Sequence, residues 1–391
     1  MAIEGSSEKK AARIRFGMVG GGQGAFIGGV HRIAARIDDQ FDLVAGAFSS
    51  TAEKSQASGA DLGLNPARVY DDFAQMARRE ARRKDGIEAV AIVTPNHMHF
   101  APARAFLKRG IHVICDKPLT ATLAQARLLA AAAETSGALF ILTHNYTGYP
   151  MIRQAREMVA GGLLGDLRLV QSEYVQDWLT EALEQSGQKQ ADWRTDPARS
   201  GAGGCIGDIG THAFNLASFV SGLTLDSLAA DLHSFVDGRR LDDNAHVMLR
   251  WAGGAKGMIW ASQVAPGNEN GLKLRLYGTK GGLEWAQEEP NYLWFTPFGE
   301  PKRLITRGGA GAGAAAGRVT RIPAGHPEGY LEGFATIYAE AARAILARRD
   351  GKMAGPEVVF PTAADGLTGV AFVDACVRSS KRNGAWVKLA L

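Results

Sequence analysis

The sequence predicts two domains: a doubly wound α/β domain with a parallel sheet, then an α+β domain with a large, open, mainly antiparallel sheet. Three observations predict this fold class. Strand and helix patterns alternate through the first third of the chain, a glycine-rich turn follows the first strand, and several strand patterns succeed one another in the second half. A length of 391 residues suits two domains. We place them at residues 1–147 and 148–391.

The first domain alternates apolar strands with helices, which predicts right-handed βαβ units and a parallel sheet. The continuous apolar run at 87–93 is typical of a strand covered on both faces. Asp71 is expected to cap a helix that reaches Arg83. The remaining predicted strands are 13–19, 41–48, 112–115 and 139–143. The remaining predicted helices are one that follows the glycine-rich turn and ends at residue 37, and two that span 53–64 and 122–135.

The second domain contains successive strand patterns without crossover helices, which indicates an antiparallel or mixed sheet. Gly253-Gly254 and Gly281-Gly282 are assigned to its turns, and the tract 308–317 is assigned to a flexible surface loop, with an active-site flap as the alternative. The predicted strands are 167–174, 225–235, 244–251, 256–263, 272–277 and 293–298. The predicted helices are 151–160, 208–220, 330–349 and 363–382, of which the last two are free to pack back on the first domain.

Composition excludes several classes of protein. A net charge of +4 is too weak a field to indicate nucleic-acid binding. Cys115, Cys205 and Cys376 are widely spaced and odd in number, which excludes a disulfide scaffold or a zinc ribbon and favours a reducing, cytoplasmic location. The chain lacks an apolar run of 18 residues, and its start through Lys10 is too polar for a signal peptide. We expect no metal site and no membrane contact.

A dinucleotide site is predicted at the glycine-rich turn after the first strand. Gly20, Gly22 and Ala25 fit the pattern G-x-G-x-x-G/A, in which the first glycine makes the tight turn and the second lets the backbone approach a pyrophosphate. The third position must be small so that helix and strand can pack. Backbone N–H groups at a helix N-terminus suit an anion. The alternative is a turn with a purely structural role.

The end of the second strand favours NADP over NAD. An NAD site usually has an acidic residue there for the ribose 2′-hydroxyl. Here Ser49 and Ser50 occupy that place and Lys54 follows, so hydroxyls and an ammonium group are available to a 2′-phosphate. The alternative for Lys54 is a solvated helix residue.

Three further polar clusters end predicted strands or begin helices, where open α/β sheets bind their ligands. They are Thr94-Pro95-Asn96 with His99, the segment Asp116-Lys117-Pro118, and the segment from Gly203 to His212 in the second domain. Asp208 and His212 are four residues apart and share a face if that segment is helical. A lysine facing an Asp/His pair from another domain makes an acid/base constellation.

At these residues the sequence resembles the Gfo/Idh/MocA family, the group of glucose-fructose oxidoreductase and inositol dehydrogenase. The resemblance covers nearly the whole chain and rests on the glycine turn, Thr94-Pro95-Asn96, Lys117-Pro118 and the pattern D-x-G-x-H at 208–212. Asp116 stands where the family usually has glutamate. The resemblance implies a Rossmann domain, NAD(P)-dependent oxidation or reduction of sugars and cyclitols, and a homodimer or homotetramer formed through the open sheet.

The resemblance also implies the roles of individual residues. Lys117, Asp208 and His212 are the catalytic candidates, and Asn96 and His99 are expected beside the nicotinamide. The other cofactor candidates are Gly20, Gly22, Gln23, Gly24, Ala25, Phe26, Ile27, Ser49, Ser50, Lys54, Thr94, Pro95, Asp116 and Lys117. The substrate candidates are His144, Tyr146, Trp193, Arg194, Asp208 and His212.

Each catalytic candidate has a structural alternative. Lys117 can be an ion-pair partner of Asp116, Asp208 an N-cap, and His212 a helix histidine without chemistry. His144 and Tyr146 either line the cleft or support it, and Trp193 is alternatively a core residue.

Our mechanistic hypothesis makes His212 the general base, oriented by Asp208, with Lys117 bonded to the reacting oxygen. An ordinary histidine pKa of about 6.5 suits this role better than a lysine pKa of about 10.4, although Lys117 as the base remains the alternative. The leading function is a sugar or polyol dehydrogenase. The competing functions are a redox-neutral NAD-dependent glycosidase and a non-catalytic nucleotide sensor.

Overall fold

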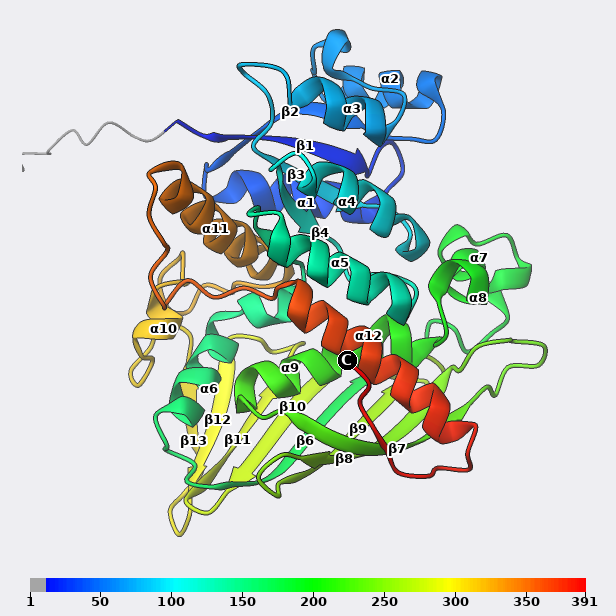
Figure 1. Ribbon diagram of the computed structural model, residues 1–391. Coiled ribbons are helices and arrows are strands. Elements are labelled where there is room, and N and C mark those ends of the chain that lie inside the picture. The colour runs from blue at the N-terminus through cyan, green and yellow to red at the C-terminus, as the bar shows by residue number, and fades with distance from the viewer. Residues whose placement is uncertain (1–11) are drawn as a thin grey trace, which may run out of the picture.

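The computed structural model describes residues 12–391. A parallel sheet with helices on both faces lies above a larger sheet whose helices cover only the face turned toward the first domain (Figure 1). The polar start through Lys10, on which the absence of a signal peptide was predicted, lies outside the described residues. Within 12–391, no helix has the length and hydropathy that a bilayer crossing requires.

The N-terminal sheet has five parallel strands in the order β2-β1-β3-β4-β5, which confirms the predicted doubly wound domain. β3 is buried along its whole length, as its apolar run predicted. Asp72, not Asp71, caps α3, because its side chain accepts the hydrogen bond from Gln75 N. The elements are β1 (Ile14–Gly20), α1 (Phe26–Ile37), β2 (Phe41–Ala47), α2 (Ala52–Asp61), η1 (Pro66–Arg68), α3 (Phe73–Glu80), β3 (Ala89–Val93), η2 (Asn96–Met98), α4 (Phe100–Leu107), β4 (His112–Cys115), α5 (Leu123–Thr135), β5 (Phe140–Leu142) and η3 (Asn145–Gly148).

The second sheet has nine strands in the order β13-β12-β11-β10-β6-β9-β8-β7-β14, and only the β6–β9 pair is parallel. This confirms the large, mainly antiparallel sheet. Its elements are α6 (Pro150–Ala160), β6 (Leu167–Val175), η4 (Leu183–Gln185), α7 (Lys189–Arg194), α8 (Pro197–Ser200), the π-helical turn η5 (Ile206–Gly210), α9 (Thr211–Ser221), β7 (Leu225–His233), β8 (Asn244–Trp251), β9 (Lys256–Ser262), β10 (Gly271–Gly278), β11 (Gly281–Ala286), β12 (Tyr292–Pro297), β13 (Arg303–Thr306), α10 (Ala314–Gly317), α11 (Tyr330–Arg349), α12 (Ala363–Ser380) and β14 (Val387–Lys388).

The two long C-terminal helices connect the domains. α11 packs on α1, and Phe334 and Tyr338 share a buried cluster with Ile14 and Phe16 of β1. α12 lies between α5 on one side and β7 and α9 on the other. Figure 1 shows both helices between the two sheets. The hydrophobic core around β1 therefore contains residues from both sides of the predicted boundary at residue 147. The boundary itself stays a prediction.

Two local predictions for the second domain are wrong. Gly281 and Gly282 begin β11 instead of forming a turn, and a Cβ at either position would lie under 3 Å from Thr296 O or the Tyr277 ring. Glycine in a strand often marks such a close approach.

The tract 308–317 was expected to be a flexible loop, yet it ends in the short helix α10, which packs on α6. Gln154 and Glu157 of α6 accept hydrogen bonds from Gly313 N and Ala315 N, and Ala316 is fully buried.

Candidate active site

The predicted phosphate cradle lies between β1 and α1. Gly20 and Gly21 have φ values of 78° and 72°, a left-handed conformation that favours glycine. No side chain caps α1 at Ala25, and its first turn contains no acidic residue. A cavity of about 420 Å³ opens on this turn and is lined by Gly21, Gly22, Gln23, Gly24, Ala25, Phe26, Gly29, Arg32, Ser58, Asp61 and Leu62. The residues present therefore fit an anionic group such as a pyrophosphate.

Tight packing around the turn requires glycine at two more positions. A Cβ on Gly22 would lie 2.6 Å from Ser58 Oγ and 3.0 Å from Phe48 O. A Cβ on Gly28 would lie 2.4 Å from the Cα of Gly21. The close contact between α1 and the glycine turn is made at Gly28, the third residue of the helix, and the role expected of Ala25 stays a prediction.

Side chains around the cradle are already partly bound. Gln23 Nε2 donates to Asp61 Oδ2 at 2.6 Å, and Arg32 Nη1 donates to Gly21 O at 2.6 Å. Phe26 is 72% exposed at the first position of α1, and Ile27 beside it is half-buried. An exposed aromatic ring at this place is available to a bound cofactor.

The residues predicted to contact the ribose follow β2. Thr51 caps α2 by accepting a hydrogen bond from Lys54 N, and the Lys54 and Ser50 side chains are exposed beside the half-buried Ser49. No carboxylate stands among Ser49, Ser50 and Thr51.

His99 does not line the cleft. It is fully buried, and its two ring nitrogens lie 2.7 Å from Pro118 O and 2.8 Å from Thr94 O. The expectation that it lies beside the nicotinamide is therefore wrong, because neither nitrogen is free for a ligand. His99 instead ties the Thr94-Pro95 segment to the Lys117-Pro118 segment. Asn96 remains close to the cleft, and its side chain donates to Ser200 O across the two domains.

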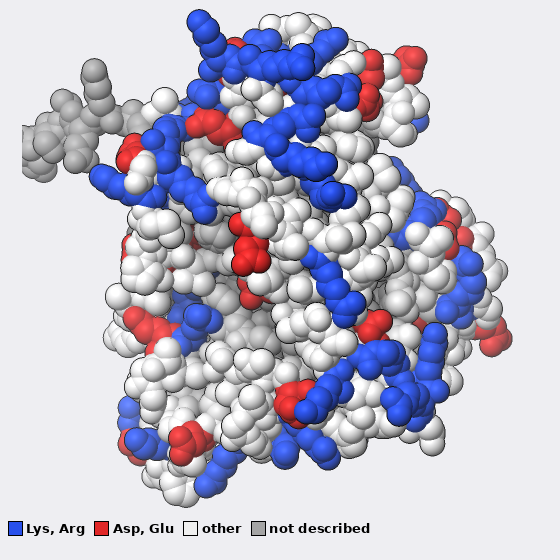
Figure 2. All heavy atoms as spheres, viewed as in Figure 1, with Lys and Arg blue, Asp and Glu red and all other residues white. Residues whose placement is uncertain are grey.

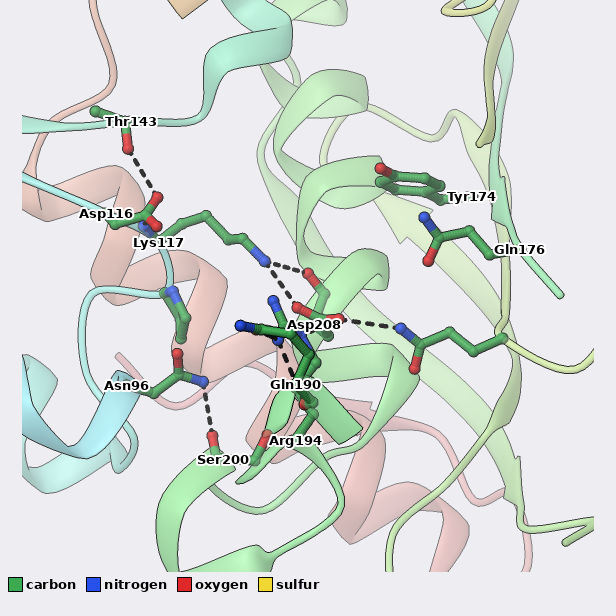
Figure 3. A network of polar contacts seen from close by, with 12 residues as sticks. Asn96, Asp116, Lys117, Thr143, Tyr174, Gln176, Gln190, Arg194, Ser200 and Asp208 are labelled. Carbon is green, nitrogen blue, oxygen red and sulfur yellow. Dashed lines mark hydrogen bonds and ion pairs between the residues drawn. The ribbon is translucent and has the colours of Figure 1, made fainter. Parts of the chain in front are cut away.

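Lys117 and Asp208 meet across the domain boundary. Lys117 Nζ lies 3.0 Å from Asp208 Oδ1 and donates to the carbonyl of the same residue at 2.7 Å. Figure 3 shows the two side chains pointing toward one another. Asp116 Oδ1 accepts hydrogen bonds from Lys117 N and Thr143 Oγ1 instead. The alternative in which Lys117 pairs with Asp116 is therefore wrong.

Asp208 is held on both carboxylate oxygens. Oδ2 accepts from Arg194 Nε at 3.1 Å and from Gln263 Nε2 at 3.0 Å. Burial alone would raise the pKa of Asp208, but the charges of Lys117 and Arg194 hold this pKa well below its usual value. Asp208 is therefore an anion with an opposing cation from each side.

Asp208 does not orient His212, contrary to our expectation. Within residues 12–391 no side-chain hydrogen bond joins them, and His212 Nδ1 is buried without a partner. The cause is local. Residues 206–210 form a π-helical turn, so the segment from Asp208 to His212 does not keep the α-helical register that the four-residue spacing assumed.

His212 sits among aromatic rings. The Tyr146 ring is 4.9 Å away and the His144 ring 5.4 Å away, both edge to face. Burial, with the charge of Lys117 adding to it, lowers the pKa of His212 well below its usual value and that of His144 to about 3. Both imidazoles are therefore neutral near pH 7, and His144 and Tyr146 form the buried wall behind His212.

Several residues of the second domain were missed by sequence reasoning. The Tyr146 hydroxyl lies 2.6 Å from that of Tyr174, which donates to Asn270 Oδ1 at 2.7 Å. Gln176 donates to the same Asn270 oxygen at 2.9 Å. Figure 3 places Tyr174 and Gln176 on the strand side of Asp208. Tyr174, Gln176 and Asn270 lie at the ends of β6 and β10. Their position at the ends of neighbouring strands is the only sequence signal that could have indicated them.

Arg194 and Trp193 lie on α7 at the edge of the site. The Arg194 guanidinium stacks 4.3 Å from the Trp193 ring, which is half-buried and does not belong to a core cluster. Within residues 12–391, no group of three His, Cys, Asp or Glu side chains is arranged to hold a metal ion.

Known proteins match both halves of the chain. The model of the oxidoreductase family with an NAD-binding Rossmann fold matches residues 14–144, and that of the GFO/IDH/MocA C-terminal domain matches residues 152–284. A crystal structure of an oxidoreductase from Sinorhizobium meliloti is 66% identical, covers 96% of this chain and 100% of its own, and superposes with a TM-score of 0.88.

Two further relatives are similar over nearly their full length. An inositol dehydrogenase homologue from Azotobacter vinelandii, crystallised with NAD+ and also with NADH and myo-inositol, is 38% identical over 97% of this chain and 98% of its own, with a TM-score of 0.93 in the NAD+ complex. The uncharacterized oxidoreductase YfiI of Bacillus subtilis is 35% identical over 96% of each protein. The chain therefore belongs to the Gfo/Idh/MocA family of NAD-binding oxidoreductases.

Proposed function

We propose that the protein transfers a hydride between a nicotinamide cofactor and a secondary alcohol or ketone of a sugar, a cyclitol or a sugar derivative. One observation carries this proposal. A lysine of the nucleotide-binding domain is held against an aspartate of the other domain, beside a neutral histidine whose Nδ1 has no partner. A protein that only binds nucleotides has no use for this set of groups.

The protein's own groups supply proton transfer and orientation. When bound, the cofactor supplies the hydride acceptor or donor. Neutral His212 has a free lone pair to accept a proton from the substrate hydroxyl, but its lowered pKa makes it a weaker base than an ordinary histidine. Lys117, held as an ammonium donor by Asp208, is suited to stabilise the developing alkoxide. Lys117 as the proton acceptor is the alternative assignment.

The proposed substrate is an uncharged polyol. Around Asp208 lie amides and phenols, namely Gln176, Gln263, Asn270 and Tyr174 of the second domain and Tyr146 at the end of the first. Such groups donate to and accept from hydroxyls. The relative from Azotobacter vinelandii was crystallised with myo-inositol, which is a substance of this class.

The preference for NADP over NAD is part of the proposal. The hydroxyls of Ser49 and Ser50 and the exposed Lys54 support it, because none of them repels a 2′-phosphate. The NAD+ and NADH complexes of the Azotobacter relative support NAD. Both cofactors therefore belong in the assay.

The test is absorbance at 340 nm with NAD+ or NADP+ and a panel of sugars and cyclitols. We expect net cofactor reduction, and Lys117→Ala should lower kcat by about 10²-fold or more while the fold survives. Near-wild-type turnover in that variant would contradict the assigned role of Lys117.

The same assay separates the competing functions. Glycoside cleavage without net cofactor reduction indicates the redox-neutral glycosidase. Nucleotide binding without turnover of any compound indicates the sensor.

We also propose a homodimer or homotetramer in the cytoplasm, with no membrane or nucleic-acid partner. All three cysteines are free and buried, which suits a reducing compartment. On the face shown in Figure 2, lysines and arginines gather over α3 and α4. Over the rest of this face, basic and acidic side chains are interspersed.

A further inference from the structure

Asp242, just before β8, holds the turn that precedes Asp208. Its Oδ1 accepts a hydrogen bond from Gly204 N at 2.6 Å, and its Oδ2 accepts one from Ile206 N at 2.8 Å. The Cys205 thiol donates to Oδ2 at 3.2 Å, and Cys205 N donates to the Asp242 carbonyl at 2.8 Å. One residue from a distant part of the chain thus binds three consecutive residues at the start of η5.

A single peptide unit connects this anchor to Asp208. Gly204 O accepts hydrogen bonds from Asp208 N at 2.9 Å and from Gly207 N at 3.1 Å. Gly204 and Asp242 are tightly packed, because a Cβ at Gly204 would lie 2.0 Å from Asp242 O. A shift of Asp242 is therefore passed to the backbone of Asp208.

The neighbouring residue fixes the Asp208 side chain. Asp243 O accepts a hydrogen bond from Gln263 N at 2.8 Å, and Gln263 Nε2 donates to Asp208 Oδ2 at 3.0 Å. The segment Asp242-Asp243 therefore supports both the backbone and the carboxylate of Asp208.

We infer that Asp242 is a positioning residue, which sets Asp208 against Lys117 through the π-helical turn. This inference rests on the proposed function, in which Lys117 and Asp208 serve the reaction. Lys117 Nζ binds both the carbonyl and the carboxylate of Asp208, so a small displacement of the turn weakens both contacts. A misplacement of about 1 Å can cost on the order of 10²-fold in rate.

The first test is Asp242→Asn. The amide has the same size but only one acceptor oxygen, so its NH₂ group faces the N–H of Gly204 or Ile206. We expect kcat to fall about 10- to 100-fold. The Kd for NAD(P)H, measured by fluorescence, should stay within about twofold, because none of the residues that line the cradle cavity belongs to this turn.

A second readout does not need turnover. Reductive ¹³C-methylation of lysines, followed by NMR, gives a resonance for Lys117, identified by its loss in Lys117→Arg. Asp242→Asn should shift this resonance, because the carboxylate beside the amine moves. If the wild-type protein turns over no compound, the proposed function fails, and the Lys117 resonance alone decides the role of Asp242.

The matched control is Asp72→Asn, which makes the same change at the cap of α3 in the other domain, where Asp72 accepts from Gln75 N at 2.6 Å. It should leave kcat and the Lys117 resonance unchanged. Should Asp242→Asn fail to fold, Asp242→Ser, which leaves room for water at the turn, replaces it. A folded Asp242 variant with wild-type kcat and an unmoved Lys117 resonance overturns the inference, as does an equal loss in the control.

Discussion

Five histidines with a lowered pKa, four of them buried and His112 half-buried, make the stability of the protein depend on pH. Burial, first among the causes, lowers the pKa of His31 and His112 to about 4 and that of His144 to about 3. An unfolded histidine titrates near pH 6.5, so between about pH 6.5 and 4 the unfolded chain binds more protons than the folded one. Stability is therefore fully present above pH 6.5 and is lost as the pH falls through this window.

The prediction is a decline in Tm between pH 7 and 5, of a few degrees for each kcal/mol lost. His112→Asn should flatten this decline, because it removes one titrating ring while an amide oxygen can still accept from Leu139 N, as Nδ1 does at 2.9 Å. Thermal denaturation at several pH values measures it. His97→Asn, at an exposed position, is the control, and equal slopes in the two variants would refute the prediction.

Single residues differ in how well the sequence predicts them. Lys117 and Asp208 were predicted because each stands in a short motif at a strand end or helix start, and the structure brings them together at 3.0 Å. The role of His99 was mistaken, because its position in a motif does not show whether its side chain points into the cleft or is buried beneath the Thr94-Pro95 segment. Gln263 and Asn270 belong to no motif, and only the pairing of β9 and β10 with β6 places them near the site.

At the level of elements, strands and helices with a clear hydrophobic period were predicted within a few residues. The failures share a cause, which is that tertiary contacts outside the hydrophobic pattern decide the local structure. Gly281 and Gly282 are in β11 because β12 and Tyr277 leave no room for a side chain. The start of the π-helical turn η5 is bound by Asp242, which lies more than 30 residues further along the chain.

The packing of α1 on β1 provides a test at this level. Gly28→Ala places a methyl group about 2.4 Å from Gly21 backbone atoms, which must then move. Overpacking of this kind costs about 1–3 kcal/mol, and the displaced turn should weaken NAD(P)H binding as well. Thermal denaturation and a fluorescence titration measure the two effects.

Gly29→Ala is the matched control in the same helix. A Cβ there meets no atom within 4 Å, and alanine favours a helix by about 1 kcal/mol over glycine. Because Gly29 lines the cradle cavity, the control applies to stability alone, and this variant should equal or exceed the wild-type Tm. A lower Tm for Gly29→Ala than for Gly28→Ala would show that the contact with Gly21 is unimportant.

At the level of the whole molecule, the nine-stranded sheet leaves one face uncovered. α6, α9 and α12 pack on the other face, and Figure 1 shows no described helix beneath it. Apolar side chains stand exposed on the uncovered face, namely Leu169, Met248, Met258, Trp294 and Leu304 at 38–56% exposure. An apolar surface of this kind is typical of a protein interface, and we propose that it binds a second copy of the chain.

Light scattering should therefore give a mass of two or four times 41.6 kDa. Met258→Lys, which puts a charge at the centre of this face, should shift the protein toward the monomer. Met353→Lys makes the same change at an 85% exposed position outside the sheet and should leave the mass unchanged. A wild-type protein that is monomeric at micromolar concentration would contradict the proposed assembly.

The helix α11 has a consequence for biosynthesis. Ile14 and Phe16 share one buried cluster with Tyr338 and Ile345, so contacts within the first core join residues more than 300 positions apart. A nascent chain emerges from the ribosome with its N-terminus first. The strands of the nucleotide-binding half are thus synthesised well before α11, and the part of the first core that α11 covers stays exposed to chaperones until this helix emerges.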